Sequence, residues 1–316
     1  MEIAGNPFEV VSFSSDQMVS DESMGTKPKY WFVRNDERWL FKVSRENTGE
    51  DWSEKLSAEV ASLVGVPHAR VELAEYNGVR GSASLSFVNP KDGTVLMHGN
   101  ELLGRTVTGY DQKLTYHQKL HTLDNIFSSL IELFELPPEM HTVKTAIQQQ
   151  VVAGWWQPQL AGYFVLDALV GNTDRHHENW GVLLKLVPEE KGGGRHMQVA
   201  PSFDHASSLG RELQDQKREQ ILRDGRIDRY TNKATGGIYL QTDNNKGARL
   251  LDVVAYGVEK FPNAFIPALN KVKAVPINDI AKLVDLIPSA RMSGLAKSFA
   301  KAVLTENYRR LVEFIP

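Results

Sequence analysis

The sequence contains no cysteine, which excludes disulfide bonds, thiolate metal sites and a cysteine nucleophile. It also has little net charge: 36 Lys and Arg against 39 Asp and Glu give a formal charge of −3, which argues against a dedicated nucleic-acid binder, since such proteins are usually basic. No apolar run approaches the roughly 20 residues that span a bilayer. The N-terminus lacks the basic and apolar regions of a secretory signal. These absences predict a soluble, cytoplasmic protein without a membrane span.

The length of 316 residues exceeds the size at which a single core usually stops growing, so we expect two lobes. The composition, 41% hydrophobic and 24% charged, is that of an ordinary globular protein. Strand-like segments dominate residues 1–100 and helical segments dominate from about 110 onward. The patterns therefore predict an α+β protein with a β-rich N-lobe over 1–100 and a helical C-lobe over 101–316.

The first lobe is predicted to be a small antiparallel sheet that carries one helix. Aromatic and β-branched residues predict a hairpin from 30–34 and 39–43, and Asn77-Gly78 marks the tip of another over 70–88. The helix is predicted over 54–65, where Gly65 ends it. In the second lobe, helices are predicted over 113–134, 141–153, 159–171, 210–223, 249–260, 276–286 and 289–314.

The most polar segment follows the apolar helix over 159–171, which Gly171 and Asn172 are expected to end. The cluster Thr-Asp-Arg-His-His-Glu-Asn-Trp comes next, and then two strand-like runs at 182–187 and 197–200 joined by a Gly-rich turn. A hairpin returns its second strand beside the start of its first, so Asn179 and Asp204 should be neighbours. Asp174, five positions before Asn179, should face the same cleft.

These three side chains suit phosphoryl transfer. One carboxylate can orient and deprotonate an attacking hydroxyl, and the other two groups offer Mg²⁺ the hard oxygen ligands that it prefers. Asp167, inside the apolar helix, is instead predicted to be a buried structural carboxylate with hydrogen-bond partners. The pattern therefore predicts kinase chemistry in a cleft between the lobes.

Lys42 has two interpretations, because one residue in two of an alternating strand faces solvent. It could be an ordinary exposed lysine, or it could reach into the cleft and bind phosphate. The small-residue loop at 23–26 favours the second interpretation, since backbone N–H groups there can approach phosphate oxygens. Glu59, in the following helix, is either a solvated charge or the carboxylate that pairs with Lys42.

Residues 172–179, which read Asn-Thr-Asp-Arg-His-His-Glu-Asn, resemble the NxDRHxxN signature of the HipA-like serine/threonine kinases. Ser202-Phe203-Asp204 resembles the segment that carries the second metal-binding aspartate of that family. The resemblance extends to residues 25–29, Lys42 and Glu59, and so runs over most of the chain. It implies a two-lobed protein-kinase-like fold and ATP- and Mg²⁺-dependent serine/threonine protein kinase activity.

The resemblance also implies a role for each matched residue. Asp174 would be the catalytic base, while Asn179 and Asp204 would hold Mg²⁺. The other matched residues would bind ATP. Lys42 would contact the phosphates, with Glu59 orienting it and His176 beside them. The loop that covers the nucleotide would consist of Ser23, Gly25, Thr26 and Lys27, and the adenine hinge of Phe87 and Val88.

Some members of this family autophosphorylate a loop serine and thereby inactivate themselves, and Ser23 is the nearest match here, with Ser20 as a second candidate. The chain begins almost at the kinase core, which makes it similar to the compact members of the HipT and CtkA types. The implied partners are ATP, a protein substrate and, for the toxin of a toxin–antitoxin system, an antitoxin. An effector kinase would instead be delivered to a host cytosol. No direct contact with nucleic acid is expected.

Three alternatives stay open. Asp174 and several histidines could bind a transition metal for hydrolysis, although neighbouring side chains such as those of His176 and His177 diverge. The histidines in question are His176, His177, His196 and His205. The fold could serve a non-catalytic interaction protein, although the Asp, Asn and Lys of a kinase are all present. Finally, the acceptor could be a lipid or a small molecule.

Overall fold

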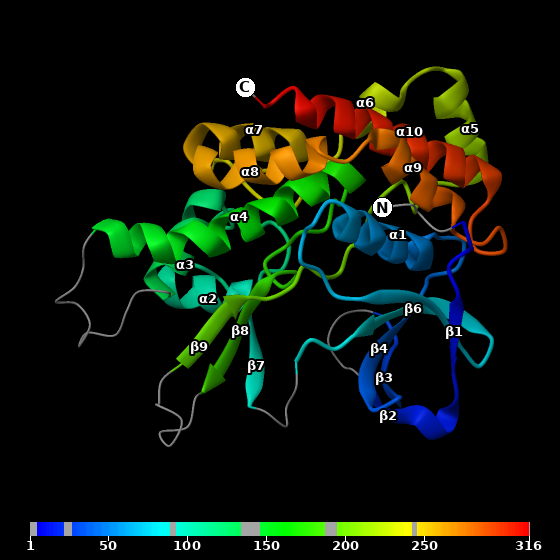
Figure 1. Ribbon diagram of the computed structural model, residues 1–316, viewed down its shortest axis with the longest axis horizontal. Coiled ribbons are helices and arrows are strands. Elements are labelled where there is room, and N and C mark those ends of the chain that lie inside the picture. Colours follow the sequence, from blue (N-terminus) through cyan, green and yellow to red (C-terminus); the bar gives the residue numbers. More distant parts are fainter. Residues whose placement is uncertain are drawn as a thin grey trace.

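The computed structural model describes residues 5–21, 27–88, 93–133, 146–186, 195–241 and 245–315. It has two lobes, as predicted, with the N-lobe sheet on one side of a buried helix and most of the other helices on the opposite side (Figure 1). Among the described residues, no helix is long and apolar enough to cross a membrane.

The N-lobe is built on a six-stranded sheet in the order β1-β5-β6-β4-β3-β2. Its strands are β1 (Val10–Phe13), β2 (Met18–Asp21), β3 (Lys29–Arg34), β4 (Glu37–Val43), β5 (Val71–Tyr76) and β6 (Val79–Leu85). Both predicted hairpins are confirmed. Their turns place Asn35, Asp36, Asn77 and Gly78 at positive φ, which short polar residues and glycine tolerate.

One strand differs from the predicted antiparallel arrangement. β1 pairs with β5 in parallel, with Val10 opposite Leu73. A hairpin turn fixes the direction of the strands that it joins, but β1 and β5 are separated by a hairpin and a helix. The sequence therefore carried no local signal for the direction of this pair.

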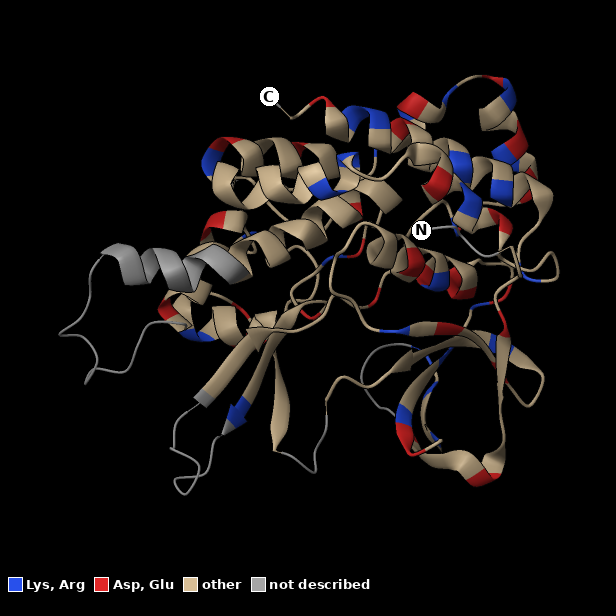
Figure 2. Ribbon diagram, viewed as in Figure 1, with Lys and Arg blue, Asp and Glu red and all other residues tan. Residues whose placement is uncertain are grey.

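Helix α1 (Glu50–Leu63) lies between the sheet and the C-lobe helices, and it begins four residues before the predicted start. Its apolar residues Trp52, Leu56 and Val60 belong to the same hydrophobic core as the C-lobe helices. Side chains of the N-lobe strands form a second, smaller hydrophobic core of mainly aromatic residues. Acidic and basic residues are interspersed along α1 (Figure 2), and several of them are buried.

The C-lobe contains a three-stranded sheet in the order β7-β8-β9. Its strands are β7 (Thr94–His98), β8 (Gly181–Leu186) and β9 (Arg195–Val199). The β8–β9 hairpin is as predicted. β7, however, pairs with β8 and not with the N-lobe sheet, so a division at residue 100 separates this strand from its partner.

The helices of the C-lobe are α2 (Gly99–Thr106), α3 (Leu123–Leu133), α4 (Ala146–Val170), α5 (Asp215–Arg223), α6 (Ile227–Thr231), α7 (Leu250–Lys260), α8 (Pro262–Lys273), α9 (Ile277–Asp285) and α10 (Gly294–Val312). α2, α6 and α8 were not predicted, and the predicted helix over 113–134 is helical only from 123. α4 runs continuously through Pro158, where two helices were predicted. The start of the first of these, 141–145, lies outside the described residues.

Candidate active site

A buried arginine holds the loop that follows α4. Arg175 is 1% exposed and donates from Nε and Nη2 to the two carboxylate oxygens of Asp167, at 2.7 and 2.8 Å. It also donates to the backbone oxygens of Asn179 and Phe203. Asp167 is thus the buried, hydrogen-bonded structural carboxylate that was predicted. This one guanidinium ties α4, the 172–179 loop and the segment before Asp204 together.

The loop brings Asp174 and Asn179 side by side. Asn179 Nδ2 donates to the backbone oxygen of Asp174 at 2.7 Å, and Asp174 N donates to Asn172 Oδ1 at 3.2 Å. Burial and the neighbouring Asp204 carboxylate raise the pKa of Asp174 to about 6, although Arg211 and Lys27 act in the opposite direction. The Asp204 carboxylate is therefore close enough to Asp174 to disfavour its charge.

Lys42 joins the two lobes at this point. It extends from β4, and its Nζ donates to Asp204 Oδ1 at 2.9 Å and lies 3.9 Å from Glu54 Oε2. Burial disfavours the charge of Lys42, but Asp204 and Glu54 outweigh this effect and raise its pKa. In return, Lys42 and Lys29 outweigh burial at Asp204 and hold its pKa well below the usual range. Asp204 is therefore an anion in the cleft, at a backbone φ of 60°.

The carboxylate beside Lys42 is Glu54, and the prediction that Glu59 pairs with Lys42 is wrong. Glu59 Oε1 instead accepts a hydrogen bond from Lys55 Nζ at 2.7 Å. Five residues on a helix correspond to a rotation of about 140°, so Glu54 and Glu59 face different directions. Burial raises the pKa of Glu54 although Lys42 lowers it, and its Oε1 accepts from the backbone N–H of His205 at 3.0 Å.

Four other residues were predicted to bind ATP and lie within the described chain. Phe87 and Val88 are half-buried after β6, and the ring of Phe87 lies 5.6 Å from that of Phe203. Lys27 pairs with the buried Glu50 at 2.7 Å. His176 is half-buried, and burial lowers its pKa despite the nearby Glu178.

The two autophosphorylation candidates and the predicted covering loop have different outcomes. Ser20 is exposed on β2, an edge strand of the N-lobe sheet two strands away from β4. Ser23, Gly25 and Thr26 lie outside the described residues.

Asn179 and Asp204 fit a Mg²⁺ ion in their donor chemistry. Because Nδ2 of Asn179 is engaged with Asp174, its amide oxygen is left for a cation, and Asp204 uses only Oδ1 for Lys42. The histidines of the alternative metal site point to other partners, for example His177 to Tyr110 and His205 to Ser202. No group of three or more His, Asp or Glu side chains within the described ranges is arranged to hold a metal. The two side-chain oxygens of Asn179 and Asp204 are of the kind that Mg²⁺ prefers.

Three residues at the site were not identified from the sequence. Glu54 and Glu50 lie on the cleft-facing side of α1, and their spacing of four residues, i to i+4, was the available signal. Glu50 accepts from Arg45 and pairs with Arg211 as well as Lys27, so three chain segments meet at one carboxylate. Arg175 was part of the signature, but its role as an anchor needed the position of Asp167.

No protein-family model matches the chain. Over 156 residues it is 28% identical to the serine/threonine-protein kinase CtkA of Helicobacter pylori. This match covers 48% of the chain and 43% of CtkA, which is less than half of that relative's length.

Solved structures extend the likeness to nearly the whole chain. The proinflammatory kinase CtkA of Helicobacter pylori has a TM-score of 0.72 at 20% identity, covering 97% of both chains. HipA of the Shewanella oneidensis toxin–antitoxin system, solved with HipB and operator DNA, has a TM-score of 0.53 at 12% identity, covering 92% of this chain and 64% of that one. The predicted resemblance is confirmed at the level of the fold: this chain has the two-lobed kinase-like fold of CtkA and HipA.

Proposed function

We propose that this chain is an ATP- and Mg²⁺-dependent serine/threonine protein kinase of the HipA-like type. The observation that carries the proposal is the ion pair between Lys42 and Asp204 across the lobes, beside Asp174 and Asn179. The sequence similarity to CtkA, named a serine/threonine-protein kinase, supports the reaction class.

Asp174 acts as the general base. Its carboxylate accepts the proton of an acceptor hydroxyl as the new O–P bond forms and the bond between the β- and γ-phosphates of ATP breaks, which leaves ADP. A pKa near 6 keeps Asp174 ionised at neutral pH while making it a better base than an ordinary aspartate. Asn179 and Asp204 would hold Mg²⁺, which when bound would supply positive charge that offsets the phosphate oxygens.

The N-lobe residues position the nucleotide. Lys42 contacts the phosphates, and Glu54 takes the orienting role first predicted for Glu59, because it is the carboxylate beside the ammonium. Phe87 and Val88 contact the adenine at the connection between the lobes. Lys27 would lie over the phosphates, and His176 beside them.

The acceptor is a protein hydroxyl. Autophosphorylation of Ser23 or Ser20 stays a prediction, and so does a role as a toxin with an antitoxin partner or as a delivered effector. The solved relative HipA belongs to a toxin–antitoxin system, which makes co-purification of a small partner protein a direct check of that role. No observation favours a lipid or small-molecule acceptor.

The test is incubation of the purified chain with γ-labelled ATP and a protein extract, with Mg²⁺ or with EDTA. We expect label on serine or threonine in the chain or in extract proteins, loss of labelling with EDTA, and rescue by Mg²⁺ but not by Zn²⁺. No labelling under any condition would support the non-catalytic alternative. Zn²⁺-dependent release of labelled inorganic phosphate, with no label on protein, would support the hydrolytic metal site.

A further inference from the structure

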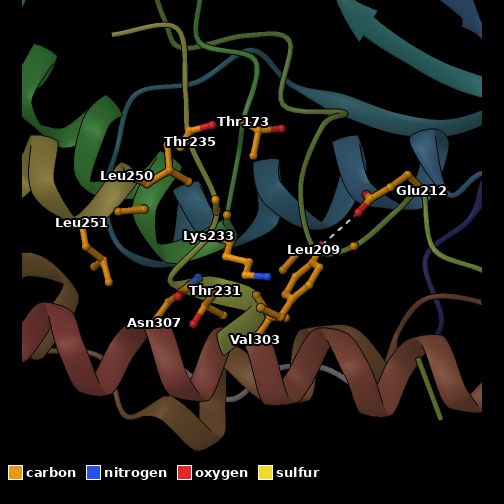
Figure 3. Close-up of a pocket in the computed structure, with 15 residues that line it drawn as sticks. Thr173, Leu209, Glu212, Thr231, Lys233, Thr235, Leu250, Leu251, Val303 and Asn307 are labelled. Atoms are coloured by element: carbon orange, nitrogen blue, oxygen red, sulfur yellow. Dashed lines mark hydrogen bonds between the residues drawn. The ribbon is translucent and has the colours of Figure 1, made fainter. Parts of the chain in front are cut away.

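Two cavities adjoin the 172–179 loop on the C-lobe side. The first, of about 290 Å³, has Asp174 in its wall together with Tyr116 and His176, and we name it the acceptor cavity. The second, of about 540 Å³, is lined by residues of α4, α6, α7 and α10, and we name it the flanking cavity (Figure 3). Thr173 and Thr235 line both cavities, so that a wall of two threonines separates them.

The wall that contains Thr235 is held firmly against the 172–179 loop. A Cβ at Gly237 would come within 2.8 Å of the backbone oxygen of Arg175, and one at Gly247 within 1.8 Å of the backbone oxygen of Gly236. Gly236 N also donates to Ala248 O at 3.0 Å. Such close contacts between backbones require glycine. This side of the acceptor cavity is therefore packed closely against the 172–179 loop.

The lining of the flanking cavity is more apolar than polar, although Thr173, Thr231, Thr235 and Asn307 also line it. Figure 3 shows aliphatic side chains around it, with Lys233 extending among them. These apolar residues are Ala168, Leu209, Ala234, Leu250, Leu251 and Val303. Leu209 has a φ of 57°, a conformation that a residue with a Cβ rarely adopts and that often marks a functional site. An apolar cavity of this size next to a reaction centre is suited to bind a ligand side chain.

The charged groups at this cavity do not favour a ligand of one sign. Lys233 is exposed and forms no ion pair within the described chain, while Glu212, also exposed, accepts a hydrogen bond from Tyr230 at 3.0 Å. One cation and one anion therefore face the same opening. The charge of a ligand is therefore not selected here, and the larger, apolar part of the lining favours an apolar ligand group.

We propose that the flanking cavity binds an apolar side chain of the protein substrate, located two or three residues from the serine or threonine that is phosphorylated. The acceptor residue itself occupies the acceptor cavity beside Asp174. An extended chain advances about 3.3 Å per residue, so two or three residues are enough to cross a wall one side chain thick. This inference rests on the proposed kinase function and specifies the substrate class of the same site.

The test uses peptides with a single serine, in which each flanking position is varied in turn, together with the full chain, Mg²⁺ and γ-labelled ATP. We expect one position within three residues of the serine to prefer Leu, Ile, Val or Phe over Gly by roughly tenfold in kcat/KM, the discrimination that one apolar pocket supplies. Ala234→Phe, which fills the cavity from a half-buried position, should reduce this preference to about one.

Matched variants separate filling of the cavity from general damage. Ala302→Phe makes the same change at a half-buried position of α10 that does not line the cavity, and it should keep the preference. Leu251→Gln makes the half-buried wall polar without adding bulk, and it serves if Ala234→Phe fails to fold. It should reduce the preference as well.

The outcomes distinguish the two proposals. Phosphorylation of the peptides without an apolar preference at any flanking position, or a preference that survives both Ala234→Phe and Leu251→Gln, overturns the docking proposal and leaves the kinase function intact. If the wild-type chain labels neither the peptides nor any protein of a cell extract, the kinase function itself fails and the docking proposal falls with it.

Discussion

Lys42 and Lys55 both meet carboxylates around α1, but the two lysines are in different states. Lys55 Nζ uses all three of its donors, on Glu59 at 2.7 Å, Glu72 at 2.7 Å and the backbone oxygen of Val71 at 2.9 Å. All three partners come from the N-lobe.

Lys42 makes one hydrogen bond among the described residues, to Asp204 of the C-lobe. Beside it, Glu54 Oε2 is buried without a hydrogen-bond partner in the described structure. Spare hydrogen-bonding capacity, more than burial or charge, therefore distinguishes a lysine that is available to a ligand from one that only stabilises the fold. Five substitutions, in four predictions, test this distinction.

Asp174→Asn should have the largest effect on activity, because it removes the general base of the proposed reaction. A positioned general base contributes about 100- to 10,000-fold, so phosphate transfer should fall by that factor. The measurement is the initial rate of label transfer from γ-labelled ATP. The Asp174 side chain makes no hydrogen bond in the described structure, so the melting temperature should barely change. A variant with full transfer would remove Asp174 from the mechanism.

Lys42→Met and Lys55→Met should act on different properties. The first should reduce transfer by about 100- to 1,000-fold, since it removes a positive charge aimed at the phosphates. The second should lower the free energy of unfolding by about 1–3 kcal/mol, because three hydrogen bonds of Lys55 are lost. Transfer rates and thermal unfolding, measured on both variants, check this. Equal effects of the two substitutions on transfer would contradict the comparison.

Glu54→Gln should have an intermediate effect. The amide can still accept from the backbone N–H of His205, but the charge beside Lys42 is lost. Mispositioning of a reacting group can cost about 10- to 100-fold, so we expect a loss of transfer in that range and a higher KM for ATP. Glu54→Asp, which retains the charge on a shorter side chain, is the control and should lose less. A variant with an unchanged KM would show that Glu54 does not orient Lys42.

Glu59→Gln should have the smallest effect. Its ion pair with Lys55 is half-exposed, and Lys55 keeps Glu72 and Val71 as partners. Exposed pairs of this kind contribute about 0–1 kcal/mol. Transfer should stay within about twofold of the wild type, since the pair lies outside the cleft. A loss comparable to that of Glu54→Gln would restore the first prediction for Glu59.

The predictions for the site that used only one loop and the hairpin after it needed no knowledge of the tertiary structure. Asp174 and Asn179 lie in one loop, and hairpin geometry alone brings Asp204 back toward them, so local rules were sufficient. The partner of Lys42 was not predictable in the same way. Choosing between Glu54 and Glu59 requires knowing which face of α1 points at β4, and the helix start at Gly49 offers no side-chain cap to mark it.

The fold shows the same limit. The hairpins were predicted because their turns are local, whereas the pairing of β1 with β5 and of β7 with β8 joins segments far apart in the chain. α8 was missed because Pro262 and Pro267 look like helix breakers, although Pro262 occupies the first helical turn, where proline is tolerated. The outer parts of both lobes depend on contacts that no short pattern encodes.

The position of β7 has a practical consequence for dividing the protein. His98, at its end, is hydrogen-bonded to the backbone oxygen of Glu178, and Gly99 N donates to Trp180 O. A cut after residue 100 would take this brace away from the 172–179 loop and leave an edge of β8 open to aggregation. A C-lobe prepared in isolation should therefore start before Thr94, so that the segment that supports the loop travels with it.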